Sequence, residues 1–138
     1  MNLKNDPRVI LSLDAGGTNL VFSAMKAGKM IGNEIVLAAK VNTLDEFLNR
    51  LTDGFEQVKK IAGEAHAISF AFPGPADYPK GIIGDLENLP VFRGGIALGP
   101  YLERKFKIPV FINNDGDLFT LGEAIGGFLP LINAELKK

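Results

Sequence analysis

A turn of small and polar residues follows the first apolar run of this 138-residue chain. The sequence DAGGTN, residues 14–19, comes directly after the run from Val9 to Leu13. Glycines let backbone amides approach an anion closely, and Thr18 and Asn19 add side-chain donors. Asp14 could hold a hydrated cation that neutralises phosphate. The stretch is a candidate phosphate-binding turn, and the plain alternative is a hairpin turn that tolerates an acid.

Two common phosphate-binding motifs are excluded at this turn. The Walker pattern Gly-x-x-x-x-Gly-Lys-Ser/Thr is absent, since Gly28-Lys29 leads into Met30. The dinucleotide pattern Gly-x-Gly-x-x-Gly is absent as well. An anion bound here would therefore be held by a different arrangement of backbone donors.

A second polar stretch, INNDGD at residues 112–117, stands where an apolar strand gives way to a helix. Open α/β sheets bind ligands at this position. Asn114 could hydrogen-bond a hydroxyl, and Asp115 could take the proton of a hydroxyl that attacks a phosphoryl group. The alternative is that Asn114 or Asp115 merely caps the helix, which is the more frequent role of such residues taken alone.

Two rigid loops form a third candidate site. Residues 72–77 read FPGPAD, residues 87–90 read ENLP, and the loops bracket a brief predicted hairpin arm at 81–85. Most loops rich in proline and glycine only connect elements. Gly74 and Asn88 therefore gain a binding role if they meet the other two motifs in space.

Two isolated polar residues complete the candidates. Glu123, on the helix after Asp115, either orients a substrate contact or lies in a solvated row. His66 opens a strand and has no partner motif, so we interpret it as structural.

The elements that must position these motifs follow from the apolar pattern. Three strand-like runs predict an antiparallel meander: residues 9–13, 20–25 and 30–39. Apolar residues then recur at three- and four-residue steps from Leu44 to Ile61, which predicts an amphipathic helix. Thr43 and Glu46 have the spacing of a capping box at its start.

Strands and helices alternate in the second half of the chain. The pattern predicts strands at 67–72 and 108–112, a helix at 98–106, and a helix from Asp115 whose apolar stripe is Leu118, Leu121, Ile125 and Phe128. The order βββαβαβα predicts the α/β class, with a mixed five-stranded sheet and helices on its faces.

Composition bounds the class of protein. The hydrophobic content is 46%, and 22% of residues are charged, which is typical of one soluble globular domain. Fifteen basic and sixteen acidic residues are scattered, a pattern that argues against nucleic-acid binding. The absence of cysteine rules out disulfides and thiolate metal sites. With no secretory signal or apolar span in view, we expect a cytoplasmic protein without membrane contact.

Together these stretches resemble the ROK family of sugar kinases and sugar-responsive repressors, which belongs to the actin-like, ribonuclease-H-like superfamily. LDAGGTN resembles the family's first phosphate motif, and AFPGPADYPKGII its Pro-Gly-Pro segment before a hairpin. ENLPVFRG resembles the Asn-Leu-Pro sugar loop, and INNDGDLFTLGEA the Asn-Asp catalytic segment. The four motifs occur in the family's order, and the resemblance covers nearly the whole chain.

The resemblance implies an ATP-dependent hexose kinase of the glucokinase type. In such an enzyme Asp115 would be the general base for the attacked sugar hydroxyl. The sugar would be held by Gly74, Asn88, Asn114, Asp115 and Glu123. The ATP phosphates would lie on Gly16, Gly17, Thr18 and Asn19, with Asp14 near Mg²⁺ through water.

The family's second lobe does not follow Lys138 in this sequence. That lobe carries adenosine contacts, a second glycine-rich motif, a Glu-x-x-His pair and usually a cysteine-rich zinc site. We therefore expect residues 1–138 to form a single N-terminal lobe that is inactive alone. Any structural zinc would belong to the absent lobe, and the full-length protein would be a homodimer acting on a hexose or N-acetylhexosamine.

Two other readings of the resemblance stay open. One is the sugar-sensing domain of a ROK repressor, although such repressors carry a helix-turn-helix ahead of the phosphate motif and thirteen residues precede Asp14. The other is an actin-like structural ATPase lobe, which leaves the Asn-Leu-Pro and Asn-Asp segments without a role.

Overall fold

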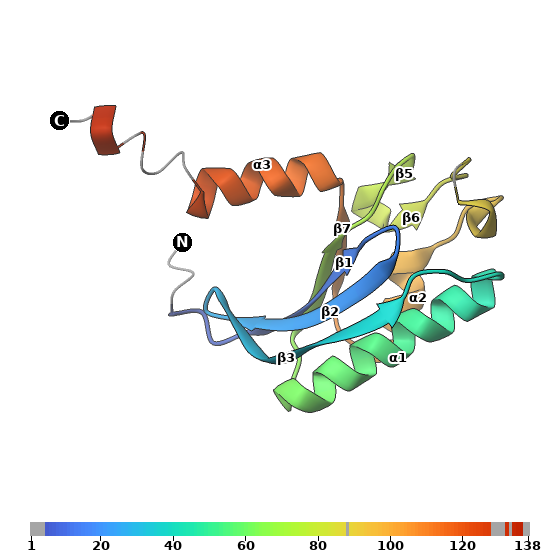
Figure 1. The fold of residues 1–138 in the computed structure, drawn as a ribbon, viewed down its shortest axis with the longest axis horizontal. Coiled ribbons are helices and arrows are strands. Elements are labelled where there is room, and N and C mark those ends of the chain that lie inside the picture. Colours follow the sequence, from blue (N-terminus) through green and yellow to red (C-terminus); the bar gives the residue numbers. More distant parts are fainter. Residues whose placement is uncertain (1–4, 88, 128–131, 133, 137–138) are drawn as a thin grey trace.

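A five-stranded mixed sheet forms the centre of the computed structural model, which describes residues 5–87, 89–127, 132 and 134–136 (Figure 1). The strands are β1 (Val9–Ala15), β2 (Asn19–Lys26), β3 (Lys29–Ala38), β4 (Ala67–Ala71) and β7 (Val110–Asn113). Their order in the sheet is β3-β2-β1-β4-β7. The first three strands are an antiparallel meander, whereas β4 and β7 run parallel to β1. The predicted mixed five-stranded sheet is confirmed.

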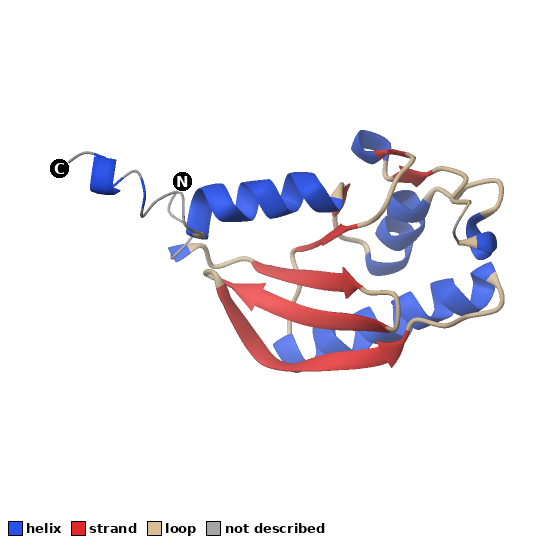
Figure 2. Ribbon diagram, turned by 45° about the horizontal axis from the view of Figure 1, so that its top comes forward, coloured by secondary structure: helices blue, strands red, loops and turns tan. Residues whose placement is uncertain are grey.

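The helices lie on both sides of this sheet. Helices α1 (Leu44–Ala62) and α2 (Leu98–Phe106) pack on one face, and α3 (Asp115–Gly126) lies on the side opposite α1 (Figures 1 and 2). A two-stranded hairpin, β5 (Ala76–Asp77) and β6 (Ile82–Ile83), stands between β4 and α2 in the chain. Short 3₁₀ helices occupy residues 78–80 and 90–92. None of the described helices is long and apolar enough to cross a membrane.

The core fills the space between the sheet and the helices α1 and α2. Alternate residues of β1 are buried, because successive side chains of a strand point to opposite faces. The predicted stripe of α1 meets them, and Phe55 is its centre. The Phe55 ring lies 5.0 Å from Phe22, 6.0 Å from Phe70 and 5.9 Å from Phe106, measured between centroids. One aromatic side chain therefore joins β2, β4 and α2.

Helix α1 begins where the capping signal predicts. The Thr43 hydroxyl accepts a hydrogen bond from the Glu46 amide at 3.1 Å. The Glu46 carboxylate accepts from the Asn42 amide at 2.7 Å, one residue before the cap. Gly63 ends the helix in the left-handed region, at φ 78°. The predicted cap and length of this helix are thus confirmed.

The last strand begins later than predicted. The apolar run from Ile108 predicts a strand at 108–112, whereas β7 starts at Val110. Lys107 ends α2 with a left-handed backbone, at φ 58°, and Pro109 has no amide hydrogen to give a neighbouring strand. The chain therefore enters the sheet after the proline.

The apolar stripe of the last helix is not packed as predicted. Leu118 is half-buried, but Leu121 and Ile125 are 53% and 52% exposed. Phe128, the fourth residue of that stripe, lies outside the described residues. Within the described part of the chain, α3 thus leaves apolar side chains in contact with solvent.

A glycine inside α1 is required by the packing of β2. A Cβ built on Gly54 would lie 2.3 Å from the Phe22 ring, which is itself fully buried. Gly54→Ala is expected to lower the free energy of unfolding by about 1–3 kcal/mol, the usual cost of overpacking a core. Urea denaturation followed by circular dichroism measures this change.

Gly122 in α3 provides the matched control. A Cβ there meets nothing within 4 Å, so Gly122→Ala is expected to stabilise the helix by about 0.5–1 kcal/mol. If Gly54→Ala stabilised the protein as much as Gly122→Ala, the contact between α1 and Phe22 would be looser than described.

Candidate active site

The three polar motifs meet at one edge of the sheet. Strands β1, β4 and β7 run parallel, and their register places Leu13, Phe70 and Ile112 in one row. The carboxyl ends of all three strands therefore lie side by side (Figure 1). Neighbouring strands are about 4.8 Å apart, so the backbones of β1 and β7 are separated by about 10 Å. This edge carries the glycine turn, the Pro-Gly-Pro loop and the Asn-Asp segment.

The glycine turn after β1 has free backbone donors. The Gly16 amide donates to the Asn19 carbonyl at 3.0 Å, and a Cβ on Gly16 would lie 3.1 Å from that oxygen, so this glycine closes the turn. The amides of Gly17 and Thr18 make no hydrogen bond within the described part of the chain. Both residues are exposed, and a Cβ on Gly17 would meet nothing within 4 Å. Two adjacent donors are thus available to an anion.

The acid of this turn suits a hydrated cation. Asp14 is exposed near the end of β1, in the same turn sequence as Gly17 and Thr18. No group of three or more His, Cys, Asp or Glu side chains that could hold a metal occurs among the described residues. Mg²⁺ needs no such cage, because it keeps several waters and binds one or two carboxylates together with substrate phosphates. The donor set therefore fits a phosphate accompanied by Mg²⁺.

The Pro-Gly-Pro loop after β4 is held against the small hairpin. The Gly84 amide donates to the Pro75 carbonyl at 2.7 Å, and a Cβ on Gly84 would lie 2.7 Å from the same oxygen. This close approach requires glycine at position 84. The loop borders a hollow of about 350 Å³ lined by Pro73, Gly74, Pro75, Asp85, Leu86, Glu87 and Leu89.

The segment that follows this hollow is anchored by an aromatic side chain. Phe92 is buried, and its ring lies 5.0 Å from Phe47 and 5.4 Å from Phe72. The Phe92 carbonyl accepts from the Gly95 amide at 2.8 Å. The core thus fixes one end of the predicted sugar loop. Asn88, the residue predicted to bind sugar from this loop, lies outside the described residues.

Two exposed ion pairs lie on the small hairpin and the loop that follows it, and one of them includes Asp85 of the hollow. Lys80 lies 3.0 Å from the Asp77 carboxylate, and its hydrogen bond holds the pKa of Asp77 below the ordinary value. Arg93 lies 3.4 Å from Asp85 across the loop. Both pairs are largely solvated, so they orient side chains more than they stabilise the fold.

The Asn-Asp segment follows β7 and opens α3. The Asn114 side-chain oxygen accepts from the Gly116 amide at 2.9 Å, and the Asn114 carbonyl accepts from the Leu118 amide at 3.1 Å. The capping role that the sequence left open for Asn114 is therefore present. Asp115 is the first residue of the helix and is exposed. Glu123 belongs to the same helix, but its side chain is outside the described part of the structure.

The glycine turn and Asp115 lie at the same edge of the sheet but have different surroundings there. The turn borders a second, largely apolar hollow of about 120 Å³, which shares Pro73 and Leu89 with the first. Asp115 lines neither of the two. That the two motifs face each other across a shared hollow stays a prediction; the strand register places both at the same edge of the sheet, with the Pro-Gly-Pro loop between them.

The side chains of His66 and Tyr78 make hydrogen bonds of different kinds. His66 accepts a hydrogen bond from the Val9 amide through Nδ1 at 3.0 Å, which supports its structural interpretation. Tyr78, by contrast, belongs to none of the predicted sites, and its hydroxyl contacts two of the polar motifs. The sequence feature that could have pointed to Tyr78 is its place in a short polar loop. The hydroxyl of a partly buried tyrosine usually finds a hydrogen-bond partner.

The meander, the two parallel strands and the loops at their carboxyl ends define an actin-like, ribonuclease-H-like α/β lobe. The model of the family described as "ROK family" matches residues 10–128. The chain belongs to the ROK family.

Several solved structures are similar to the chain. It is 57% identical to the glucokinase from Parabacteroides distasonis over 99% of its own length, with a TM-score of 0.87. Identity to the ROK hexokinase from Thermus thermophilus is 25% over 84% of the chain, with a TM-score of 0.72. A ROK family transcriptional regulator, a homologue of the E. coli MLC protein, is 22% identical over 91% of the chain, also with a TM-score of 0.72, and shares the fold.

The chain spans only part of these relatives. It covers 39% of the glucokinase, 38% of the hexokinase and 31% of the regulator. A comparison with curated proteins found no match.

Proposed function

We propose that the chain supplies one lobe of an ATP-dependent kinase that phosphorylates a hexose hydroxyl. The observation that carries this proposal is the shared edge of β1, β4 and β7, which gathers a turn with free amides and a helix start with an exposed carboxylate, Asp115. The 57% identity to a glucokinase supports it. A second lobe, absent from residues 1–138, would complete the cleft.

The glycine turn would hold the phosphate end of ATP. The free amides of Gly17 and Thr18 would donate to phosphate oxygens, while Gly16 keeps the turn closed and Asn19 adds a polar side chain. Asp14 would hold Mg²⁺ through water. The ion, when bound, neutralises charge on the phosphates.

The sugar would lie near the Pro-Gly-Pro loop. Gly74, Asn88 and Asn114 would contact its hydroxyls, with Glu123 as a further contact. Asp115 would accept the proton of the hydroxyl that attacks the γ-phosphoryl group. Phosphoryl transfer depends mainly on positioning and charge stabilisation, and loops anchored on strand ends provide both.

A sugar-sensing domain of a repressor is the second candidate function. It is favoured by the similarity to a ROK family transcriptional regulator. A sensor needs sugar contacts but no donors for phosphate, so the free amides of Gly17 and Thr18 favour the kinase.

A chimera tests the proposed function directly. Residues 1–138 would replace the matching segment of the Parabacteroides distasonis glucokinase, which is 57% identical to them. ATP-dependent phosphorylation would be measured with a panel of hexoses and N-acetylhexosamines, using the parent glucokinase as control. We expect turnover with at least one sugar, and none from the 138-residue chain alone.

Two outcomes would contradict the proposal. A folded chimera that binds ATP but phosphorylates no sugar in the panel would favour a sensor. Sugar phosphorylation by the isolated chain would show that a second lobe is unnecessary.

A further inference from the structure

The hydroxyl of Tyr78 joins two of the polar segments at the strand ends. It donates to the Phe72 carbonyl, at the start of the Pro-Gly-Pro loop, at 2.9 Å. It accepts from the side-chain amide of Asn114 at 3.3 Å. A Cβ built on Gly74 would lie 3.2 Å from the same oxygen. One oxygen atom therefore contacts the loop after β4 and the segment after β7.

The direction of these hydrogen bonds fixes the orientation of Asn114. Its Oδ1 accepts from the Gly116 amide at 2.9 Å, which places Nδ2 toward Tyr78. The Tyr78 hydroxyl can then donate only to Phe72, because its single hydrogen is used there. A flipped Asn114 amide would lose its bond to Gly116. One N–H of Nδ2 and one lone pair of Oδ1 remain for a ligand.

We propose that Tyr78 is a positioning residue for the sugar site, acting through the side chain of Asn114. This inference rests on the proposed function, because it takes Asn114 as a sugar contact. Asp115 follows Asn114 directly, so the same hydroxyl also sets the start of α3 relative to the Pro-Gly-Pro loop. Tyr78 holds two parts of the site in register through its hydrogen bonds with Phe72 and Asn114.

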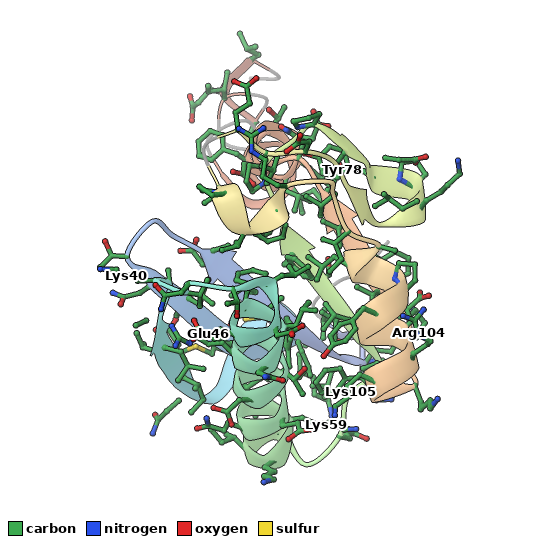
Figure 3. The ribbon with its side chains drawn as sticks, turned by 90° about the vertical axis from the view of Figure 1, so that its right-hand side faces the viewer. Lys40, Glu46, Lys59, Tyr78, Arg104 and Lys105 are labelled. Atoms are coloured by element: carbon green, nitrogen blue, oxygen red, sulfur yellow. The ribbon has the colours of Figure 1, made fainter. Side chains whose placement is uncertain are left out.

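Tyr101 offers a matched control, because the sequence holds two tyrosines. Its hydroxyl is also partly buried and lies 3.4 Å from the Thr52 hydroxyl, in the contact between α2 and α1. Figure 3 shows Tyr78 at the end of the molecule opposite Lys59 and Lys105, which mark the last turns of those helices. Tyr78→Phe and Tyr101→Phe each remove one oxygen and keep the ring.

The first measurement uses the 138-residue chain and nuclear magnetic resonance. In Tyr78→Phe, the proton chemical shifts of the assigned Asn114 side-chain NH₂ group are expected to change, because one of its hydrogens loses its hydrogen bond to the Tyr78 oxygen. In Tyr101→Phe they are expected to stay unchanged. Unchanged Asn114 signals in Tyr78→Phe would overturn the positioning role, whatever the protein's activity.

The second measurement uses the glucokinase chimera, at a temperature where every variant is folded by circular dichroism. Tyr78→Phe is expected to lower kcat/KM for the sugar by about 10- to 100-fold, the scale of a misplaced binding group, with the KM for ATP unchanged. Tyr101→Phe is expected to keep the parent value. Equal sugar kcat/KM in the two variants would overturn the inference.

A second variant separates positioning from folding. Tyr78→4-aminophenylalanine keeps a donor for the Phe72 carbonyl, but its ring-bound amine is a poor acceptor for the Asn114 amide, so it should fold and still lose sugar kcat/KM as Tyr78→Phe does. If Tyr78→Phe does not fold, this variant carries the test, and the parent kcat/KM in the folded variant contradicts the inference. If the chimera without any substitution shows no turnover, the proposed function is contradicted instead. The Asn114 signals would still decide whether Tyr78 orients that side chain.

Discussion

Asp115→Asn is expected to lower phosphoryl transfer by about 10²- to 10⁴-fold in the glucokinase chimera, the usual contribution of a general base. Asparagine keeps the size of the side chain and can still hydrogen-bond a sugar hydroxyl. It cannot take up the proton that the hydroxyl releases during attack. Sugar affinity, measured by calorimetry without ATP, should therefore stay within a few-fold of the parent value while kcat falls.

Asp117→Asn is the matched control for this substitution. Asp115 and Asp117 both belong to the acidic first turn of α3, and both are exposed. Each carboxylate favours the helix start by about 0.3–1 kcal/mol, so both variants weaken α3 similarly. Only Asp115→Asn should lose turnover. Equal kcat in Asp115→Asn and the parent chimera would remove Asp115 from the mechanism.

Phe55→Ala is expected to cost about 3–5 kcal/mol of unfolding free energy in the 138-residue chain, because it removes a fully buried ring. The ring contacts Phe22, Phe70 and Phe106, so the cavity would open between the sheet and both helices of that face. A loss of this size is a large part of the stability of an ordinary domain. Urea denaturation measured by fluorescence and by circular dichroism would report it.

Phe119→Ala is the control for the core substitution. Phe119 is 71% exposed on α3, so its removal should change the unfolding free energy by about 0.5 kcal/mol or less. Similar losses in the two variants would mean that α3 is packed in solution and that the aromatic cluster around Phe55 is less central than its ring contacts indicate.

The main elements could be predicted from the sequence because local patterns determine them. The period of apolar residues and the Thr43 cap predict α1, and the predicted helix at 98–106 coincides with α2. The shared edge follows from the same pattern, since strands joined by crossover helices run parallel. The polar motifs at 14–19 and 112–117 therefore had to meet at one end of the sheet.

The finer geometry of the site depends on contacts that no local pattern encodes. The hydrogen bond between Tyr78 and Asn114 joins residues 36 positions apart. The division of the edge into two hollows depends on how Pro73 and Leu89 pack after the chain has folded. The sequence predicts which residues reach the edge, but these long-range contacts decide how each side chain is aimed.

The exposed side chains of α3 have a mechanical consequence for Asp115. Phe119, Leu121 and Ile125 are each more than half exposed, and the helix that carries them begins at Asp115 itself. A partner that covered these side chains would also change the direction of the helix axis, and with it the position of the Asp115 carboxylate at the strand end after Asn113.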